Sequence, residues 1–578
     1  MGDLKVASGL KQLFNHRKRL LILGLTGRTG SGCTTLATIL QESKFEELNI
    51  RHPPIPPVTH EDRKFRVVID WIATNWHPFR KISVSELIAG HVALYGFSSF
   101  LTFINNLCNE HPQLGGTNLE PLASLETIFN AASSSANESK LWDPSYERRD
   151  EMASVTAFIF GALPVFSKMF RKALTEQSPN LDSLFFQTVG DNIRRSGAPY
   201  DVQNDPEKLF TIPRVLEKLI DFCIYEDEKS GSPTYLVIDA IRHPFEARYL
   251  QERYAYFYLL AVTASDNDRK QRLIDQQFRA DEIVRLDIKE YPREKKGEKL
   301  KGYDLLVSQD IQSSIENADI YLFNENDSSS AHSPHSLKEQ VLRYISLMMH
   351  PGLITPTNIE RCMQAAFTAK LNSGCISRQV GAVVADSGYS VKSIGWNDVP
   401  RGQVPCALRN VRHLFSQQDP NAFSEYENGE EFRTHILAQP LARLQLPHYE
   451  GRNLSYCFKA NYNELKDEKN QVHTRSLHAE ENAFLQLARG TGQVAEGGFL
   501  FTTASPCELC AKKAFQLGIS LIYFIDPYPG ISNVHVLAHG KKEFRPQLRQ
   551  FTGAVGRTYH QLFAPIMPMK DELSFLIP

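Results

Sequence analysis

Four side chains in the carboxyl-terminal part of the sequence have the types and the spacing of a metal-dependent site. His478 and Glu480 are separated by one residue, and further on Pro506 introduces a Cys-x-x-Cys sequence formed by Cys507 and Cys510. One imidazole and two thiolates supply three ligands to a tetrahedral zinc ion, and an ion with three protein ligands keeps its fourth position for water. The pattern therefore predicts a catalytic zinc site.

The elements that carry these residues must present them at their ends. On a regular helix His478 and Glu480 would point about 200° apart, so they can serve one site only if the metal lies off the start of the helix that follows. Pro506 suits the first turn of a second helix, where exposed amide groups and the helix dipole favour thiolate over thiol. We therefore expect both groups of ligands at the start of a helix.

Each half of this pattern has a simpler interpretation when it stands alone. A Cys-x-x-Cys pair is more often a structural zinc knuckle or a redox pair, and a single histidine is more often a core residue. The joint pattern His-x-Glu…Pro-Cys-x-x-Cys is the signature of zinc nucleobase deaminases. We expect Glu480 to take a proton from the water at the metal, to protonate the ring nitrogen and to pass a proton to the departing ammonia.

Apolar runs alternate with helical stretches through the first half of the chain. A strand beginning at Leu20 is followed by others at Thr234–Ile238, Tyr258–Val262 and Ala318–Phe323. This alternation predicts a parallel sheet covered on both faces. Residues 1–323 are therefore predicted to form an α/β domain.

A polar, serine-rich stretch at residues 324–336 has the composition of a linker, and we place the domain boundary there. Residues 337–578 are predicted to form a second α/β domain. Its predicted helices are Leu337–Met349, Thr357–Leu371, His478 to about Arg489, and about Cys507 to Leu517; its predicted strands are Val380–Ala385, Gly498–Thr503 and Leu521–Ile525.

A glycine-rich turn follows the first strand and precedes a helix. Residues 27–34 fit the phosphate-loop pattern G-x-x-x-x-G-K-[ST] except that Cys33 replaces the lysine. The loop backbone could still cradle phosphates and Thr34 could still reach Mg²⁺, but the charge that meets the β and γ phosphates is absent. The pattern favours nucleotide binding and argues against phosphoryl transfer. The nucleotide-binding residues predicted here are Gly27, Gly30, Ser31, Gly32, Cys33 and Thr34.

Further candidates in the first domain rest on their place in the pattern alone. Asp239 ends a strand where a second acidic motif would hold Mg²⁺, and Arg242, Arg269 and Arg272 lie where nucleotide kinases keep phosphate-binding arginines. Capping or surface roles explain each of them nearly as well. A glycine turn with no ligand is the alternative for the loop itself.

Composition narrows the classes of function. Lys and Arg number 64 against 66 Asp and Glu, which leaves a net charge of -2 and no overall basic field for a long nucleic acid. We find no apolar run long enough to span a membrane and no secretory signal. Nine scattered cysteines do not form the framework of a secreted disulfide protein. We expect a cytoplasmic protein that acts on small polar substrates.

Residues outside the zinc pattern carry a family resemblance. Arg361–Ala366, Ser373–Val383 and Gly395–Asn397 resemble the amino-terminal half of deoxycytidylate (dCMP) deaminases. The whole chain, with a P-loop nucleotide-kinase-like domain before a cytidine/deoxycytidylate-deaminase-like α/β/α domain, looks like the bacterial anti-phage dCTP deaminases. That resemblance implies zinc-dependent conversion of dCTP, and in some members dCMP, to the uracil nucleotide, which depletes a pool that phage replication needs.

The resemblance also implies roles for particular residues. Asn397 would contact the sugar of the substrate and Arg378 its phosphates, to which a bidentate guanidinium is suited. Arg401, Arg409 and Arg412 are further phosphate candidates, for which a solvated surface charge is the favoured alternative. A second, structural zinc is a candidate partner of Cys375, Cys406 and His473, with Cys457 as another ligand candidate; buried free cysteines are an equal alternative.

Several partners and alternatives stay open. The family implies a homo-oligomer, commonly a hexamer, and sometimes an inhibitory small RNA. The first domain is expected to sense a nucleotide effector or another phage-related signal and to gate the deaminase. A housekeeping dCMP deaminase and a tRNA or single-strand deaminase are the enzymatic alternatives, although the latter needs a basic groove with stacking aromatic residues. A nucleotide-sensing regulator with a structural zinc is the non-enzymatic one.

Overall fold

The computed structural model divides the chain into two compact units. Unit 1 contains residues 1–355 and 557–578, and unit 2 contains residues 356–556. The structure describes residues 2–111, 114, 117–143, 153–276, 278–290, 302–325, 335–444, 448, 450–468, 470, 472–490, 496–526 and 532–575.

Unit 1 is built on a parallel sheet, as predicted. Its strands are β1 (Leu20–Thr26), β2 (Arg80–Ser83), β3 (Thr234–Asp239), β4 (Phe257–Thr263) and β5 (Ile320–Phe323), in the spatial order β5-β4-β1-β3-β2. All four pairings among them are parallel. β1, β3 and β4 are almost entirely buried, which explains their continuous apolar sequences.

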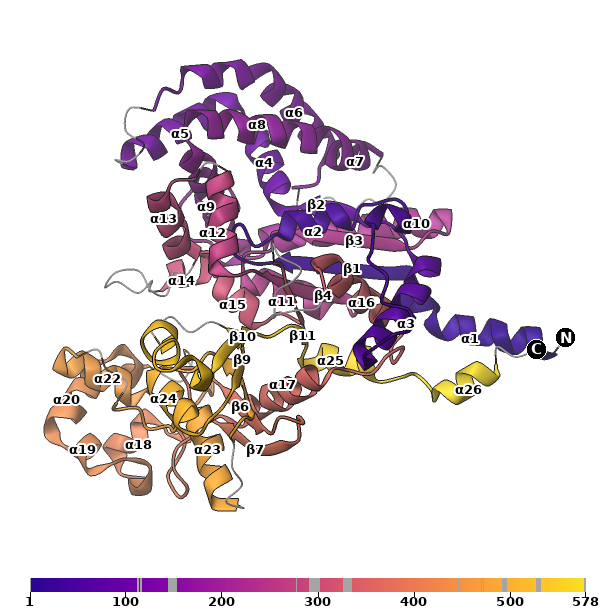
Figure 1. Cartoon of the computed structure of the whole chain (residues 1–578). Helices are drawn as coiled ribbons and strands as arrows, with labels where there is room; N and C mark the ends of the chain where they lie inside the picture. Colours follow the sequence, from indigo (N-terminus) through magenta and orange to yellow (C-terminus); the bar gives the residue numbers. More distant parts are fainter. Residues whose placement is uncertain are drawn as a thin grey trace. The chain divides into compact units, whose positions relative to one another are not determined.

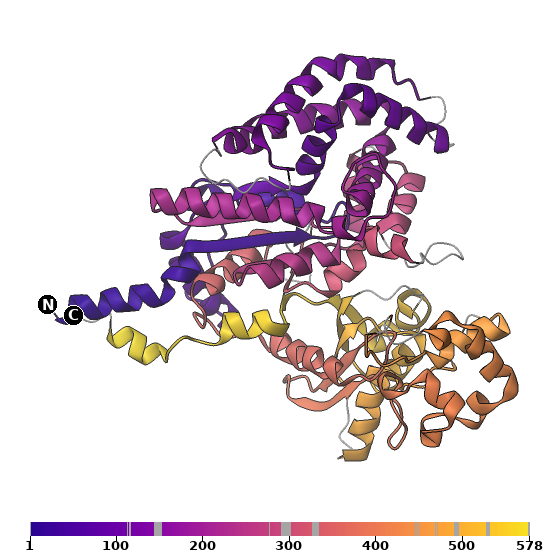
Figure 2. The same ribbon diagram turned by 180° about the vertical axis from the view of Figure 1, so that it is seen from behind.

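Helices cover both faces of this sheet (Figures 1 and 2). α2 (Cys33–Ile39) and α16 (Leu337–Met349) lie on the face turned toward the viewer in Figure 1, and α10 (Thr211–Ser230) and α11 (Pro244–Arg253) lie on the face seen in Figure 2. The sheet core is therefore closed on two sides, as expected for buried parallel strands.

A helical group stands at the carboxyl ends of the strands. It contains α4 (Val84–Leu94), α5 (Phe97–Glu110), α6 (Glu126–Ser139), α8 (Leu163–Gln177) and α9 (Pro179–Ser196). The remaining described α-helices of unit 1 longer than five residues are α1 (Gly2–Arg19), α3 (His60–Asn75), α12 (Asp266–Asp275), α13 (Ala280–Glu290), α15 (Ile311–Glu316), α25 (Gly556–Phe563, whose first residue closes unit 2) and α26 (Met569–Ser574). Among the described residues no single helix could cross a membrane by length and hydropathy, whereas α4 and α5, bent by 113°, pass that test as a pair.

Unit 2 has a mixed sheet. Its strands are β6 (Gly381–Ala385), β7 (Val391–Trp396), β8 (Phe499–Ala504), β9 (Leu521–Asp526) and β10 (Gln547–Gln550), in the order β10-β9-β8-β6-β7. β6 is antiparallel to both β7 and β8, and β8, β9 and β10 are parallel. Its helices are α17 (Asn358–Ala369), α18 (Val411–Ser416), α19 (Glu425–Asn428), α20 (Glu430–Ala438), α22 (Phe458–Lys466), α23 (Ala479–Gly490) and α24 (Glu508–Gln516).

Alternating residues of β6 face two different layers of helices. Ala382 and Val384 belong to a core formed with α23 and α24, whereas a side chain on Gly381 would meet the backbone of α17. This alternation follows from the two-residue period of a strand. The sheet of unit 2 is thus sandwiched between helices, with α23 and α24 on one face.

The domain boundary differs from the predicted one. α16 matches the predicted helix 337–349, but it packs with α2 and β5 and belongs to unit 1, so unit 2 begins at Pro356. The last 22 residues of the predicted second domain, 557–578, also belong to unit 1. Most of the predicted linker, residues 326–334, lies outside the described residues.

Candidate active site

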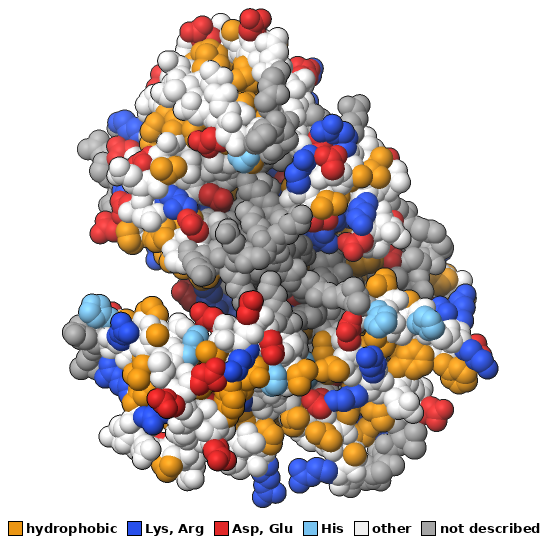
Figure 3. Space-filling model, turned by 90° about the vertical axis from the view of Figure 1, so that its left-hand side faces the viewer, with side chains coloured by type: hydrophobic (Ala, Val, Ile, Leu, Met, Phe, Trp, Pro, Cys, Tyr) orange, Lys and Arg blue, Asp and Glu red, His pale blue; other side chains and the backbone are white. Residues whose placement is uncertain are grey.

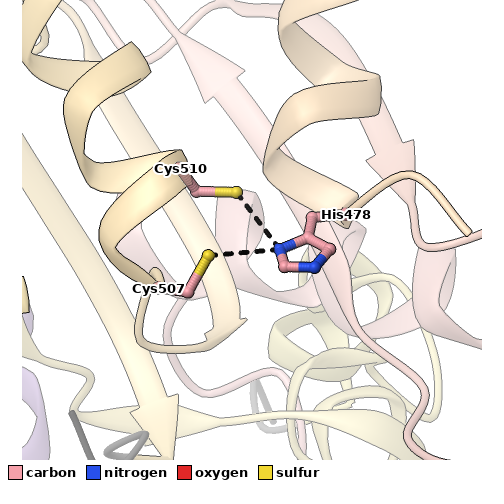
Figure 4. Close-up of side chains that lie close together, drawn as sticks. All are labelled: His478, Cys507 and Cys510. Carbon is pink, nitrogen blue, oxygen red and sulfur yellow. Dashed lines mark hydrogen bonds between the residues drawn. The ribbon is translucent and has the colours of Figure 1, made fainter. Parts of the chain in front are cut away.

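Three of the predicted metal ligands lie together in unit 2 (Figure 4). His478 Nδ1 is 3.2 Å from Cys507 Sγ and 3.5 Å from Cys510 Sγ. The three ligand atoms all lie within 4.8 Å of one another. Among the described residues, this is the group of three or more His, Cys, Asp or Glu side chains that could hold a metal ion. The structure therefore brings the sequence-predicted ligands into one cluster.

The dimensions of the cluster suit zinc. Ligand bonds of about 2.0 to 2.3 Å in tetrahedral geometry put a nitrogen and a sulfur about 3.5 Å apart. The two measured nitrogen–sulfur distances lie close to that value. An imidazole and two thiols also form a donor set that zinc prefers.

Cys507 is held in a position that favours its thiolate. It is the N-cap of α24, and its carbonyl oxygen accepts a hydrogen bond from the Ala511 amide at 2.8 Å. A hydrogen bond from the Cys510 thiol, followed by one involving His478, lowers the pKa of Cys507 to about 4. Pro506 precedes this N-cap, so it lies just before the helix and not in its first turn as predicted.

Glu480 lies beside the cluster and is fully enclosed. It is the second residue of α23, and His478 directly precedes that helix, which is the arrangement that their spacing requires. Only 4% of Glu480 is exposed, and its Oε1 accepts a hydrogen bond from Thr502 Oγ1 at 3.0 Å. Burial raises the pKa of the Glu480 carboxyl. A carboxyl that holds its proton more readily is suited to acid and base chemistry.

Two further positions matter for this geometry, although the sequence did not indicate that they position Glu480. Thr502 faces Glu480 from the middle of β8, where the two-residue alternation of the strand sends it to the helix side. Gly395 in β7 lies against the start of α23, where an added Cβ would be 2.3 Å from the Ala479 oxygen and 2.4 Å from the Ala483 nitrogen. Only glycine permits that approach, so Gly395 fixes how close the helix carrying Glu480 comes to the sheet.

The predicted substrate contacts already have partners within the chain. Asn397 is buried, and its side chain accepts a hydrogen bond from the Val380 amide at 2.6 Å and donates one to the Arg378 carbonyl at 2.7 Å. Arg378 forms an ion pair with Asp526 at the end of β9. Asn397 thus fixes the backbone of the segment that carries Arg378, and contact of either residue with a substrate remains a prediction.

Among the three further arginine candidates, Arg409 fits neither the predicted phosphate contact nor the alternative of a solvated surface charge. Its guanidinium is only 1% exposed, pairs with Glu427, and lies over the rings of Phe423 and Tyr456 at 4.8 and 4.9 Å. Phe423 and Tyr456 are members of a small hydrophobic core within residues 411–465, so Arg409 packs against that core. Arg401 is exposed, and Arg412 is exposed and donates to the Leu444 carbonyl.

The candidates for a second zinc do not form a metal-binding group in the described part of unit 2. Cys375, Cys406 and Cys457 are close enough to influence one another electrostatically, because the other two thiols raise the pKa of Cys406, although burial raises it most. His473 instead lies against Tyr462, with ring centroids 4.2 Å apart and the rings tilted by 43°, and it is 3.9 Å from the Glu468 carboxylate.

The glycine-rich loop in unit 1 lines a large cavity. The cavity measures about 720 Å³ and is bounded by Gly27, Gly30, Gly32, Cys33 and Thr34 of the predicted loop. Ser31 is buried beside it. Burial raises the pKa of the Cys33 thiol to about 12, so Cys33 stays neutral where the phosphate-loop pattern has a lysine.

The remaining predicted residues of unit 1 gather around this loop. Thr34 Oγ1 donates to Asp239 Oδ2 at 3.1 Å, and Asp239 Oδ1 is buried without a hydrogen-bond partner in the described structure. Arg272 donates to the Gly30 and Ser31 carbonyls, and Arg269 donates to the Thr29 carbonyl at 3.2 Å. These two arginines therefore brace the loop.

Arg242 also contacts the loop, through Thr29. It lies 3.2 Å from Glu290 Oε1 and the same distance from Thr29 Oγ1. Each of the three arginines predicted to bind phosphate thus holds the protein's own loop.

Comparison with known proteins identifies the second unit. Residues 356–526 match the family model described as cytidine and deoxycytidylate deaminase zinc-binding region. Unit 2 is thus similar to the zinc-binding region of cytidine and deoxycytidylate deaminases. The chain is 28% identical over 175 residues to the deoxycytidylate deaminases of Enterobacteria phages T2 and T4, alignments that cover 29% of this chain and 78% and 76% of those proteins. This similarity supports a hydrolytic deaminase. It confirms the resemblance of the second unit to dCMP deaminases.

One solved structure is similar to part of this chain over most of its own length. The dCMP deaminase of cyanophage S-TIM5, solved in complex with dCMP and dUMP, is 22% identical, and the comparison covers 34% of this chain and 99% of that chain with a TM-score of 0.21. The match to the family model covers unit 2 only, so the kinase-like nature of unit 1 remains a prediction.

Proposed function

We propose that the protein is a zinc-dependent deaminase of free deoxycytidine nucleotides that converts dCTP to dUTP and also accepts dCMP. The observation that carries this proposal is the cluster of His478, Cys507 and Cys510 with the buried carboxylate of Glu480 beside it. A structural zinc site has no use for an enclosed carboxylate next to its ligands, whereas hydrolytic deamination requires a group that moves protons.

Each residue of the cluster has a defined task. His478, Cys507 and Cys510 would hold a zinc ion, which would act as the Lewis acid that activates water. Glu480 would accept a proton from the attacking water and deliver it to the N3 atom of the cytosine ring. It would then take the remaining proton from the new hydroxyl group on C4 and donate it to the amino group, which leaves as ammonia. Thr502 holds the carboxylate toward the cluster, and the enclosure of Glu480 keeps competing water away.

A free nucleotide suits this chain better than a polynucleotide does. The formal net charge is -2, and on the face displayed in Figure 3 Lys and Arg side chains are interspersed with Asp and Glu. Polynucleotide deaminases need a basic path along the phosphate backbone. Incubation with dCTP, dCMP and single-stranded oligonucleotides, with ammonia release as the readout, tests the assignment. Release from oligonucleotides alone would overturn it.

Unit 1 is proposed to bind a nucleotide and to regulate the deaminase. The support is a cavity of about 720 Å³ beside the glycine loop, a size suited to a small ligand. Thr34 and the unpartnered oxygen of Asp239 offer oxygen atoms of the kind that Mg²⁺ binds. Because Cys33 is neutral, phosphoryl transfer is expected to be weak or lost. Robust ATP-dependent phosphorylation of deoxynucleoside monophosphates, abolished by Gly32→Val, would contradict this expectation.

The biological role that we propose is defence against phage by depletion of dCTP. It is supported by the resemblance described above and depends on the deaminase activity. Nucleotide profiles of cells carrying the parent or the Glu480→Ala protein, with and without phage, test it. Loss of dCTP on infection only with the parent is expected, and equal dCTP levels in both would contradict the role.

A further inference from the structure

The cavity of unit 1 extends from the glycine loop to a wall of a different character. That wall is formed by α8 and α9, and one stripe of α9 faces the cavity, with lining residues at positions 182, 183, 186, 187 and 190. The spacing is that of one side of a helix. A core-facing stripe would be apolar, yet this one contains Asp182, Ser183 and Gln187 around a single aromatic ring, Phe186.

The carboxylate of Asp182 lacks a donor for one of its oxygens. Oδ2 accepts from Arg171 Nη2 at 2.6 Å, whereas Oδ1 is buried and has no hydrogen-bond partner in the described structure. The residue is only 6% exposed, so water reaches it poorly. Burial raises the pKa of Asp182 even though Arg171 acts against the shift. Leaving a buried acceptor unsatisfied costs about 1 to 3 kcal/mol, which suggests that a ligand supplies the missing donor.

The neighbours of Asp182 form the rest of a small recognition site. The Arg171 guanidinium lies over the Phe186 ring at 4.7 Å from its centroid, which fixes both side chains. An aromatic face beside a few placed polar groups is the usual wall of a nucleoside pocket. The lining as described contains five arginines, Arg28, Arg171, Arg194, Arg242 and Arg272, and the first four of them each form an ion pair with a carboxylate of the chain.

We propose that this wall is a nucleobase subsite, in which Asp182 accepts a hydrogen bond from the exocyclic amino group of a cytosine or adenine nucleotide whose phosphates lie at the glycine loop. The proposal rests on the nucleotide binding proposed for unit 1 and adds the class of base. Phe186 provides the surface against which the base packs.

The chemistry of the base edge explains this choice. Cytosine and adenine each present an amino donor next to a ring nitrogen acceptor, which matches the acceptor of Asp182 beside the donors of Arg171. Uracil and hypoxanthine carry a carbonyl oxygen where the amino group stands, and that oxygen would face the carboxylate. A site built around a hydrogen bond rejects the analogue that lacks the donor.

Equilibrium binding to the full chain tests the subsite. The chain carries Glu480→Ala so that no probe is turned over, and the probes are two pairs that differ in one group, dATP with dITP and dCTP with dUTP, all with Mg²⁺. We expect the amino member of at least one pair to bind at least about tenfold more tightly, and Asp182→Asn to remove that preference while triphosphate binding persists. The pair that shows the preference identifies the base. The adenine pair also avoids competition from the cytosine site of unit 2.

Control variants show whether a change in binding comes from the subsite itself. Glu176→Gln, which removes an exposed carboxylate from α8 that pairs with Lys172, should leave every affinity unchanged. Phe186→Leu should weaken both members of a pair equally, and the thermal midpoint of each variant checks its folding. Equal binding within both pairs, or a preference that survives Asp182→Asn, would overturn the subsite alone. Failure of all four nucleotides to bind outside the cytosine site of unit 2 would overturn the nucleotide binding proposed for unit 1, and the subsite with it.

Discussion

The Glu480 carboxylate and the Thr502 hydroxyl lie 3.0 Å apart inside unit 2, and neither side chain is open to solvent. Thr502 comes from β8 and Glu480 from the first turn of α23, so this contact ties the helix that follows His478 to the central strand of the sheet. The same hydroxyl lies 2.8 Å from the Ala504 oxygen. It is therefore held in place on both sides, and it orients the carboxylate.

Replacing Thr502 with valine should slow catalysis without emptying the metal site. Valine has nearly the same shape but cannot donate a hydrogen bond, and a hydrogen bond to a charged group is worth about 1.5 to 3 kcal/mol. We expect kcat for ammonia release to fall about tenfold or more while the zinc content stays that of the parent. Thr502→Ser is the matched control and should retain most of the activity. Equal rates for the valine variant and the parent would show that Thr502 does not orient Glu480.

Gly395→Ala should displace α23 and with it Glu480. The new Cβ would meet backbone atoms of the helix at 2.3 and 2.4 Å, and backbone cannot move aside as a flexible side chain can. Overpacking of this kind costs about 1 to 3 kcal/mol, so we expect a lower melting temperature together with a large loss of activity. Gly161→Ala is the control, because nothing lies within 4 Å of the position of its Cβ. If both variants melt and react alike, the close approach at Gly395 has no role.

Local patterns predicted that His478, Cys507 and Cys510 would lie together. The ligands lie at the ends of elements whose apolar runs and Pro506 mark their bounds, and α23, β8 and α24 begin within a residue of where they were expected. What the sequence could not show depends on contacts between distant segments. Arg409 is buried because residues 411–465 make their own core, and residues 557–578 pack with unit 1 although they follow unit 2 in the chain. No local pattern around either segment indicates those partners.

Glu427→Gln should destabilise the segment around Arg409. Glu427 is 1% exposed and pairs with both Arg409 and Arg475, so neutralising it leaves the buried Arg409 and the partly buried Arg475 without that counter-charge. Breaking a buried pair in this way costs about 3 to 5 kcal/mol. Thermal unfolding and limited proteolysis within residues 411–465 measure the effect. Glu425→Gln, an exposed change on the same helix α19, should be neutral; similar behaviour of the two variants would contradict the structural role of Glu427.

The stability of unit 1 should fall in mild acid because of His91. Burial lowers the pKa of His91 from 6.5 to about 4, so the folded protein keeps it neutral while the unfolded chain takes up a proton as the pH falls below 6.5. The stabilising effect is complete above pH 6.5 and is lost progressively toward pH 4, with a slope of up to about 1.4 kcal/mol per pH unit. His91→Phe should flatten this slope when melting temperatures are compared from pH 8 to pH 4.5. Parallel curves for the two proteins would mean that His91 is not buried in its neutral form.

The most direct test of the account measures zinc content and ammonia release on the same preparations of the parent and of Glu480→Ala. The parent should contain zinc, release ammonia from dCTP or dCMP, and lose that activity on chelation. Glu480→Ala should keep the zinc of the parent and lose at least about a hundredfold in rate, as expected for removal of a general acid and base. Deamination by Glu480→Ala at the rate of the parent, or activity in a parent preparation free of zinc, would contradict the account.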